Sequence, residues 1–303
     1  MKFAYLILSY KNFEQLKRFI SSIEGDGVRI YIHIDKKVYV SPQLREQLIA
    51  LGGNISIVDD CDRVSVFWGG FSLVDAMIVT MHSYLSDDFV ADYVHICTDS
   101  DDLIRPRAEM EQFMISKGLD RNYLTLYALP NEMWRDGGMG RFIYKWSYDY
   151  RSKFGAMLSV KIQKILGLRR KLPPTVEFYG GSSWMTLTHA AISYVSQQSV
   201  PSNEIFRHFR YVAIPDESYI HTLLMNSSRF RDSVEYNNLR YIKWSPPSPH
   251  PQILTPQDRD EWLASGQFIG RKFLPMPLSP KSWHERWGVI RSRVGNYFKH
   301  FGR

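Results

Sequence analysis

The chain has 303 residues, of which 44% are hydrophobic and 14% aromatic. This is enough apolar material for one large domain, or for a domain with a subdomain, and it excludes intrinsic disorder. The net charge of +7 raises the question of nucleic acid. The sequence contains no recognised nucleic-acid motif and no basic groove pattern with interleaved base-stacking aromatics, so we expect no nucleic-acid partner.

The compartment is indicated by the cysteines and by the N-terminus. Cys61 and Cys97 form neither a disulfide framework nor a metal-binding spacing, which favours a reducing environment. The apolar run at the N-terminus is too short for a membrane span or a standard secretory signal, and no other stretch approaches the roughly twenty apolar residues of a membrane helix. We therefore expect a cytoplasmic protein, peripheral at most to the inner face of the cytoplasmic membrane.

The first half of the chain alternates apolar strands with amphipathic helices, and Ser41 is the expected cap of the second helix. This alternation predicts an α/β fold with a mostly parallel sheet, whose ligands bind beyond the carboxyl ends of the strands. No glycine-rich phosphate loop follows any strand, which argues against an ATPase or a Rossmann dehydrogenase. Strands are predicted over 3–9, 28–34 and 54–58, and helices over 12–23 and 41–51.

Further along, a strand is predicted to reach Trp68 before a Gly-Gly turn and an amphipathic helix. The next strand, over 93–97, runs into Asp99, Asp101 and Asp102. An Asp-any-Asp pair is typical of a divalent-cation site that holds a nucleotide-sugar diphosphate. Two other interpretations remain open here: one carboxylate binds sugar hydroxyls without metal, or the acids form a turn before a helix.

Asp35 stands at the end of the 28–34 strand, where a carboxylate can accept from a nucleotide, or can pair with Lys36 or Lys37. Asp216 and Glu217 follow a proline in "YVAIPDESYIHTLL". Because burying a bare charge costs several kcal/mol, such a pair is solvated, paired or used chemically. Pro-Asp-Glu is also an ordinary helix start.

Two segments carry the excess positive charge. Residues 151–171 hold seven Lys or Arg and no acid, and residues 283–303 hold five and one acid. Apolar residues recur in the second segment at helical spacing, which is typical of an interfacial helix, although a helix packed on its own domain with a solvated basic face fits equally. These residues are Trp283, Trp287, Ile290, Val294, Phe298 and Phe301.

Nine ordered blocks of the sequence together resemble the core-2/I-branching β-1,6-N-acetylglucosaminyltransferase family, which includes the peptide O-xylosyltransferases. The blocks are "AYLILSYKN", "YIHIDKK", "VFWGGFSLVDA", "HICTDSDDLIRP", "GGSSWMTLTHAAISYV", "IPDESYIHTLLMNS", "NNLRYIKWS", "SPHPQILT" and "ASGQFIGRKF". Members from the animal secretory pathway have a membrane anchor and many cysteines. Since this chain matches neither property, it looks like a bacterial, cytoplasmic branch.

The resemblance implies a GT-A type fold and inverting transfer of N-acetylglucosamine or xylose from a UDP-sugar to a glycan acceptor, free or lipid-linked, without a metal cofactor. It implies a nucleotide-sugar-binding half over 1–125 and an acceptor-binding and catalytic half of the same domain over 126–275. The charge pattern adds a basic amphipathic tail over 276–303. The bacterial surface polysaccharides built at the membrane are the expected products. A peripheral contact with an anionic membrane is the expected means of reaching them.

The resemblance also implies site residues. Glu217 matches the general base, with Asp216 capping the following helix or orienting its neighbour, and Arg271 and Lys272 match the groups that meet the UDP diphosphate. The implied donor-binding residues are Asp35, Asp101, Ser183, Trp184 and His250, with Ser183 and Trp184 on a strand that lines the pocket. The implied acceptor-binding residues are Glu132, Trp134, Arg135 and Arg141.

Two alternatives stay open. Asp99 and Asp102 depart from the family pattern, which shows one acid there, so a metal-dependent GT-A transferase that uses Asp99 and Asp101 is the first. The second is a glycan-binding relative without catalysis.

Overall fold

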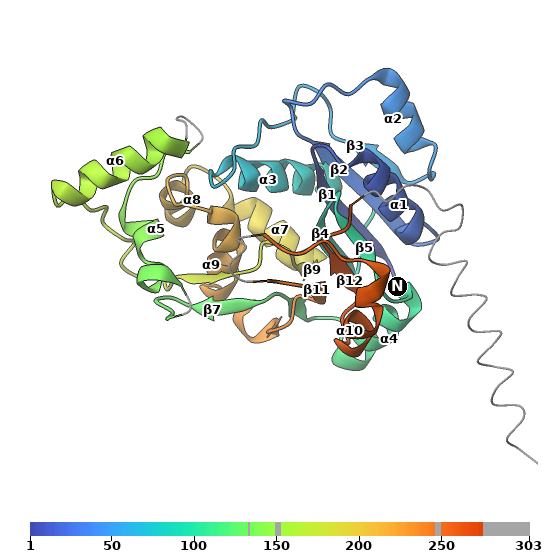
Figure 1. Ribbon diagram of the computed structural model, residues 1–303. Coiled ribbons are helices and arrows are strands. Elements are labelled where there is room, and N and C mark those ends of the chain that lie inside the picture. The colour runs from blue at the N-terminus through green and yellow to red at the C-terminus, as the bar shows by residue number, and fades with distance from the viewer. Residues whose placement is uncertain (133, 149–152, 246–249, 275–303) are drawn as a thin grey trace, which may run out of the picture.

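The computed structural model describes residues 1–132, 134–148, 153–245 and 250–274, and Figure 1 shows their arrangement. The predicted helix in the C-terminal tail lies outside these residues. Within the described part of the chain, no helix combines the length and the apolar character needed to cross a bilayer.

A seven-stranded sheet forms the centre of the molecule, in the order β10-β6-β9-β4-β1-β2-β3. The run β4-β1-β2-β3 is parallel throughout, as the alternating pattern predicts, and β9 pairs antiparallel with β4 and with β6. The strands are β1 (Phe3–Ser9), β2 (Val28–Ile34), β3 (Ile55–Ile57), β4 (Tyr93–Thr98), β6 (Asn122–Tyr123), β9 (Thr186–Thr188) and β10 (Val234–Glu235). The α/β class and the mostly parallel sheet are confirmed.

The strand β1 explains why a continuous apolar run is required. Tyr5 and Ile7 face one core, whereas Leu6 and Leu8 face the other, and all four are buried. Since successive side chains of a strand point to opposite faces, only a run without polar interruptions can bury both. The sheet is therefore covered on both sides.

Helices from different parts of the chain cover the two faces (Figure 1). The apolar sides of α3, α7 and α9 fill the first core, and those of α1 and α4 fill the second. The side chain of Ser41 accepts from the backbone N–H of Leu44, so the predicted cap of α2 is confirmed. The helices named here are α1 (Phe13–Ile23), α2 (Pro42–Ile49), α3 (Ser72–Leu85), α4 (Arg107–Lys117), α7 (His189–Gln198) and α9 (Tyr219–Met225).

The second half of the chain returns into the first at two places. The strand β9 is inserted between β4 and β6 in the central sheet. In a smaller sheet of order β11-β12-β5, β12 (Ile269–Arg271) runs antiparallel to β5 (Asp101–Leu103), with β11 (Arg240–Ile242) on its other side. The register of β12 sets Arg271 opposite Asp101. The two predicted halves therefore share their sheets.

One predicted strand is absent, because residues 63–68 form neither strand nor helix. The backbone N–H of Val64 donates to Nε2 of His33, and its carbonyl accepts from the N–H of Lys36. These partners are a side chain and a loop, whereas a strand needs a second strand beside it. The prediction of a strand that reaches Trp68 was wrong.

Candidate active site

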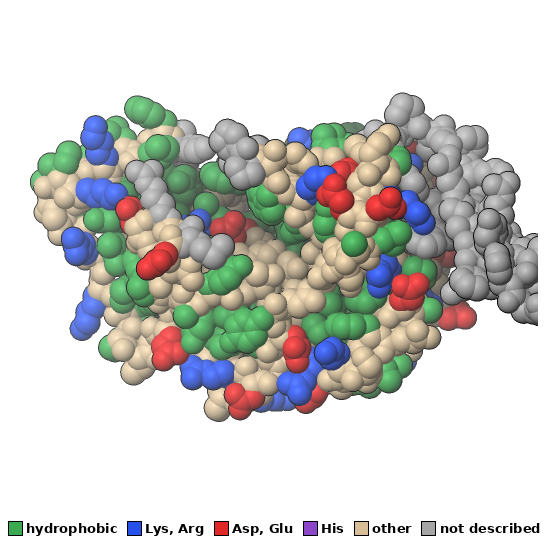
Figure 2. Space-filling model, turned by 60° about the horizontal axis from the view of Figure 1, so that its bottom comes forward, with side chains coloured by type: hydrophobic (Ala, Val, Ile, Leu, Met, Phe, Trp, Pro, Cys, Tyr) green, Lys and Arg blue, Asp and Glu red, His purple; other side chains and the backbone are tan. Residues whose placement is uncertain are grey.

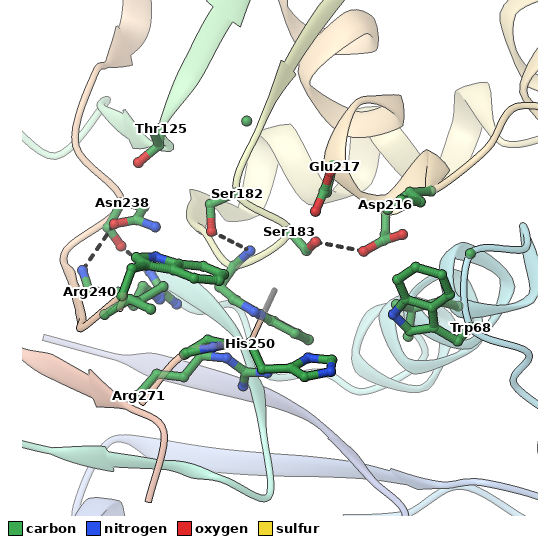
Figure 3. Close-up of a pocket in the computed structure, with 18 residues that line it drawn as sticks. Trp68, Thr125, Ser182, Ser183, Asp216, Glu217, Asn238, Arg240, His250 and Arg271 are labelled. Atoms are coloured by element: carbon green, nitrogen blue, oxygen red, sulfur yellow. Dashed lines mark hydrogen bonds between the residues drawn. The ribbon is translucent and has the colours of Figure 1, made fainter. Parts of the chain in front are cut away.

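A cavity of about 730 Å³ lies where the two halves of the chain meet. One side is formed by the segments around Ser183 and Glu217, and the other by Arg271 and His250 (Figure 3). Its lining comes from residues 68, 69, 73, 125, 181–184, 214, 216, 217, 238, 240, 242, 244, 250, 251 and 271. The cavity thus gathers five of the predicted site residues: Ser183, Trp184, Glu217, His250 and Arg271.

Glu217 is brought to the cavity by a strained turn. Ile214 has a φ of 51°, a left-handed conformation that is rare for a β-branched residue, and its N–H donates to the carbonyl of Gly69. The 3₁₀ turn Pro215–Glu217 follows, directly before α9. Strain of this kind persists only where the surrounding structure enforces it, and it collects at functional sites.

The carboxylate of Glu217 is held by Arg141. Nη1 of Arg141 donates to Oε2 of Glu217 over 2.7 Å, and the side chain of Glu217 stays 35% exposed. The guanidinium lies 4.1 Å from the ring centroid of Trp134. That ring packs so closely on Gly180 that a Cβ there would overlap it. Trp134 therefore fixes Arg141, and Arg141 fixes Glu217.

The predicted acceptor-binding residues divide into two groups. Arg141 and Trp134 lie in one chain of contacts with Glu217, as described above. Glu132 is exposed on the loop before them, and the side chain of Arg135 lies outside the described part of the structure. The structure thus brings two of the four to the general-base candidate.

Asp216 also lines the cavity, and its carboxylate is bound by the neighbouring loop (Figure 3). It is buried, and its Oδ2 accepts from Oγ of Ser183 over 2.6 Å. Burial and then the negative charge of Glu217 raise the pKa of Asp216 to about 6, and the Ser183 hydrogen bond opposes this only in part. The helix α9 has no side-chain cap, so the expectation that Asp216 caps it was wrong. Asp216 instead ties the Glu217 turn to the neighbouring loop.

The opposite wall carries a cation with a buried counter-ion. Nη1 of Arg271 lies 2.9 Å from Oδ1 of Asp101, whose side chain is fully buried, and it also donates to Oγ1 of Thr98. The guanidinium carbon lies 4.4 Å from the ring centroid of Trp184, within range of a cation–π contact. Asp101 therefore acts on the cavity through Arg271 and is itself outside the lining.

The other residues predicted to bind the sugar donor lie on a loop or outside the cavity lining. Ser183 and Trp184 follow β8 (Tyr179–Gly181) and precede β9, so they lie on a loop and not on a strand as expected. Lys272 follows Arg271 but is not among the lining residues. Asp35 is also outside the lining: its Oδ1 accepts from the N–H of Lys37, and its Oδ2 lies 3.5 Å from Nζ of Lys37.

Hydroxyl and backbone N–H groups of the protein donate hydrogen bonds to the acidic residues that follow β4. Oδ2 of Asp99 accepts from Oγ of Ser9 and from the N–H groups of Tyr10 and Asn12, at 3.0, 3.0 and 3.2 Å. Burial raises the pKa of Asp102, a residue that accepts from Ser22. Asp99 thereby fastens the start of α1 to β4.

These contacts bear on the predicted alternative metal site. The oxygens of Asp99 bind the backbone, and those of Asp101 bind Thr98 and Arg271. In the residues that the structure describes, no three His, Cys, Asp or Glu side chains come together in a way that could hold a metal ion. The arrangement does not fit a divalent-cation site built on Asp99 and Asp101.

Three residues of the cavity escaped the sequence reasoning. Arg240 is buried beneath it and donates to the carbonyls of Ile96 and Met185. Trp68 and Trp244 line it, and these residues are 63% and 56% exposed. The blocks "VFWGG" and "RYIKWS" contained all three, but nothing in a sequence tells a buried arginine from a surface one, or an exposed tryptophan from a core one.

Comparison with known proteins identifies the family. The family model described as Core-2/I-Branching enzyme matches residues 3–262. The chain belongs to this family. Among curated relatives, it is 27% identical to Xylosyltransferase 2 of Homo sapiens over 81% of its length and 27% of that protein, and 25% identical to Xylosyltransferase sqv-6 of Caenorhabditis elegans over 80% and 28%. The chain thus spans little more than a quarter of these relatives.

Two solved structures complete the comparison. The chain is similar to mouse xyloside xylosyltransferase 1 in its apo form over 92% of its length and 100% of that chain, with a TM-score of 0.40 and 9% identity. It is similar to S. aureus TarS over 97% of its length and 40% of that chain, with a TM-score of 0.37 and 10% identity.

Proposed function

We propose that this member of the Core-2/I-branching enzyme family is an inverting glycosyltransferase of GT-A type that moves N-acetylglucosamine or xylose from a UDP-sugar to a glycan acceptor. The proposal rests on one observation, namely that the two opposite walls of the cavity carry groups of opposite charge. A carboxylate, Glu217, and a guanidinium, Arg271, line the same cavity. Inverting transfer needs one base and one positive group for the leaving diphosphate.

Glu217 is the general base in this mechanism. As the acceptor hydroxyl oxygen forms its bond to the anomeric carbon, its proton passes to Glu217, and the bond from that carbon to the UDP oxygen breaks with its electron pair on UDP. Arg141 occupies Oε2 of Glu217. The second oxygen of the carboxylate is then the acceptor of the proton, and its direction is set by the Arg141 contact.

Arg271 meets the negative charge that develops on the diphosphate. Its guanidinium is held by Asp101 and by the Trp184 face, so little reorganisation is needed when the leaving group departs. Lys272, the next residue, is proposed as a second positive group and His250 as a neighbour of the diphosphate. Asp35 is proposed to approach the uridine only in the donor complex, because Lys37 holds it here.

We also propose that transfer needs no divalent metal. The support is the use of the Asp99 and Asp101 oxygens by protein donors. Trp68 and Trp244 line the cavity and are partly exposed, and aromatic side chains of this kind suit the apolar C–H face of a sugar ring. Acceptor and donor sugars are the ligands proposed for them.

The biological setting follows from charge. We place the reaction in the synthesis of a bacterial surface polysaccharide, with a glycan or lipid-linked glycan as acceptor, in the cytoplasm at the inner face of the membrane. The support is the pair of basic segments at 151–171 and 283–303, since anionic lipid attracts such segments.

The proposal is tested with a panel of UDP-sugars, with slow donor hydrolysis measured in the presence of a chelator. We expect one donor to be turned over, and Glu217→Gln to lower that turnover by about 10²–10⁴-fold while UDP still binds. Glu177→Gln is the control, because Glu177 pairs with Arg231 outside the cavity lining. Turnover that survives Glu217→Gln would refute the role of Glu217, and loss of turnover in chelator would establish the metal-dependent alternative.

A further inference from the structure

The helix α6 (Lys153–Ile165) presents an apolar face that the described part of the protein leaves uncovered. Figure 1 shows it standing out from the body, at the end of the molecule opposite α2 and α4. The exposed fractions of seven apolar side chains in and just after the helix lie between 46% and 76%. These residues are Phe154, Met157, Leu158, Ile162, Ile165, Leu166 and Leu168.

The helix has two distinct faces. Ala156 and Val160 are buried against the body, and the side-chain amide of Gln163 exchanges hydrogen bonds with the backbone of Lys145. At about 100° per residue, Phe154 and Leu158 fall on the opposite side of the helix. The exposed apolar residues therefore do not result from fraying, because the helix is fixed through its other face.

The charge around this face selects the partner. Residues 151–171 carry seven Lys or Arg and no acid, and Lys161 and Lys164 lie within the helix among the apolar side chains. Figure 2 shows Lys and Arg side chains beside hydrophobic ones at this end of the molecule. A second copy of the chain would bring like charges together, which opposes self-association through this face. Anionic lipid neutralises the cations and accepts the apolar side chains.

The attachment of α6 connects it to the cavity. Nε1 of Trp146, just before the helix, donates to the carbonyl of Gly140, and the N–H of Arg170, just after it, donates to the carbonyl of Ile143. Both carbonyls belong to α5 (Gly140–Ile143), the helix that carries Arg141. The surface and the general-base candidate are thus joined through one short helix.

We propose that α6 is a membrane-docking helix, whose exposed apolar face enters the interface of an anionic bilayer while its lysines bind the headgroups. This inference rests on the proposed function, because it brings the Glu217 side of the cavity to acceptors that lie at a lipid surface. It concerns residues 154–168, and it is independent of the C-terminal tail.

The test uses the full chain and sedimentation with vesicles of phosphatidylglycerol and phosphatidylcholine. Replacing three apolar side chains together, Phe154→Ser, Leu158→Gln and Ile162→Gln, is expected to weaken vesicle binding by about tenfold or more. Lys161→Gln and Lys164→Gln are expected to weaken it by about fivefold each at low salt. Hydrolysis of the UDP-sugar in solution is expected to stay unchanged in all of these variants.

The matched control replaces three exposed apolar residues elsewhere, Ile49→Gln, Val90→Gln and Ile115→Gln, and it is expected to bind vesicles like the parent. A second measurement does not depend on the triple variant. In a Cys61→Ser background, an environment-sensitive fluorophore on Ile162→Cys is expected to shift to the blue with anionic vesicles. The same fluorophore on Ile115→Cys is expected not to shift.

Several results would overturn the inference. Vesicle binding that is unaffected by the α6 substitutions, or equally strong on pure phosphatidylcholine, would do so. Binding that depends only on residues 283–303 would assign the contact to the tail. A dimer that the α6 substitutions dissolve, without vesicle binding by the parent, would show that a second copy covers the face. Donor hydrolysis is measured separately from vesicle binding. Failure of the docking inference can therefore be told apart from failure of the proposed function.

Discussion

Arg141 donates to Glu217 over 2.7 Å while its guanidinium rests on the ring of Trp134. The three side chains come from two segments that are more than seventy residues apart, and Gly180 leaves just enough room for the ring. An ion pair of this kind orients a carboxylate more than it stabilises the fold, because both partners are partly exposed. In the proposed mechanism, its value lies in the position that it gives to the carboxylate of Glu217.

Arg141→Gln is therefore expected to lower kcat by about 10–100-fold, as small misplacements of a reacting group do. KM for the UDP-sugar is expected to stay near that of the parent, since Arg141 is not among the residues that line the cavity. Arg141→Lys is expected to restore part of the rate. Steady-state kinetics with the donor varied provides the measurement. A rise in donor KM of about 10–100-fold, with kcat unchanged, would contradict a positioning role.

A second prediction concerns the stability of the fold against pH. Burial and the charge of Glu217 raise the pKa of Asp216 from its ordinary value near 4 to about 6. Between these two values the folded state binds the proton more tightly than the unfolded state, so the free energy of unfolding falls as pH rises through this window. Above pH 6 the ionised carboxylate costs about 1–3 kcal/mol.

Asp216→Asn keeps an oxygen that can accept from Ser183 and removes that cost. We expect it to raise the free energy of unfolding at pH 8 by about 1–3 kcal/mol, and to change it little at pH 4. Urea denaturation at the two pH values measures the difference. Asp26→Asn, at an exposed position, is the control. The same gain at both pH values would show that the ionisation of Asp216 is not its cause.

The pair of Arg271 and Asp101 allows donor binding to be separated from folding. Arg271→Met leaves the Asp101 carboxylate buried without its cation, which is expected to cost about 3 kcal/mol of stability. Adding Asp101→Asn removes the uncompensated charge and is expected to recover most of this loss. Affinity for UDP is expected to stay low in both variants, because the guanidinium is absent from both. Recovery of UDP binding in the double variant would mean that Arg271 serves the fold alone.

A substitution at Asp99 tests whether this carboxylate has a structural role or binds a metal ion. Asp99→Asn weakens the hydrogen bonds that fasten the start of α1, and we expect it to lower the free energy of unfolding by about 1–3 kcal/mol. At a temperature where the variant is folded, its donor hydrolysis is expected to match that of the parent and to be insensitive to Mn²⁺ or chelator. A metal response that this substitution abolishes would assign the carboxylate to an ion instead.

The sequence patterns predicted the first part of the fold because local rules decide it. The strand β1 is apolar and buried at each position from Phe3 to Leu8, and Ser41 caps α2, so pattern and structure agree there. Residues 63–68 have the same β-branched and aromatic character, yet they form no strand. Their partners are His33 and Lys36, which depend on the final position of β2.

The sequence predicted those residues of the site that belong to recognisable family blocks. The family blocks pointed to Glu217 and Arg271, and the structure places both in one cavity. They did not indicate that Asp101 is the counter-ion of Arg271, since the two lie 170 positions apart and meet only through β5 and β12. Nor does a proline followed by two acids reveal that Ile214 must adopt a left-handed conformation.

The pairing of β12 with β5 has a consequence for how the protein is made. Asp101 enters the fold early in synthesis, whereas the arginine that neutralises it is added only after a further 170 residues. A nascent chain that ends before β12 contains Asp101 without the cation that pairs with it, and among the described residues only Thr98 then donates to its carboxylate. Such an intermediate cannot form the smaller sheet, so the ion pair of Asp101 and Arg271 assembles only after β12 has been synthesised.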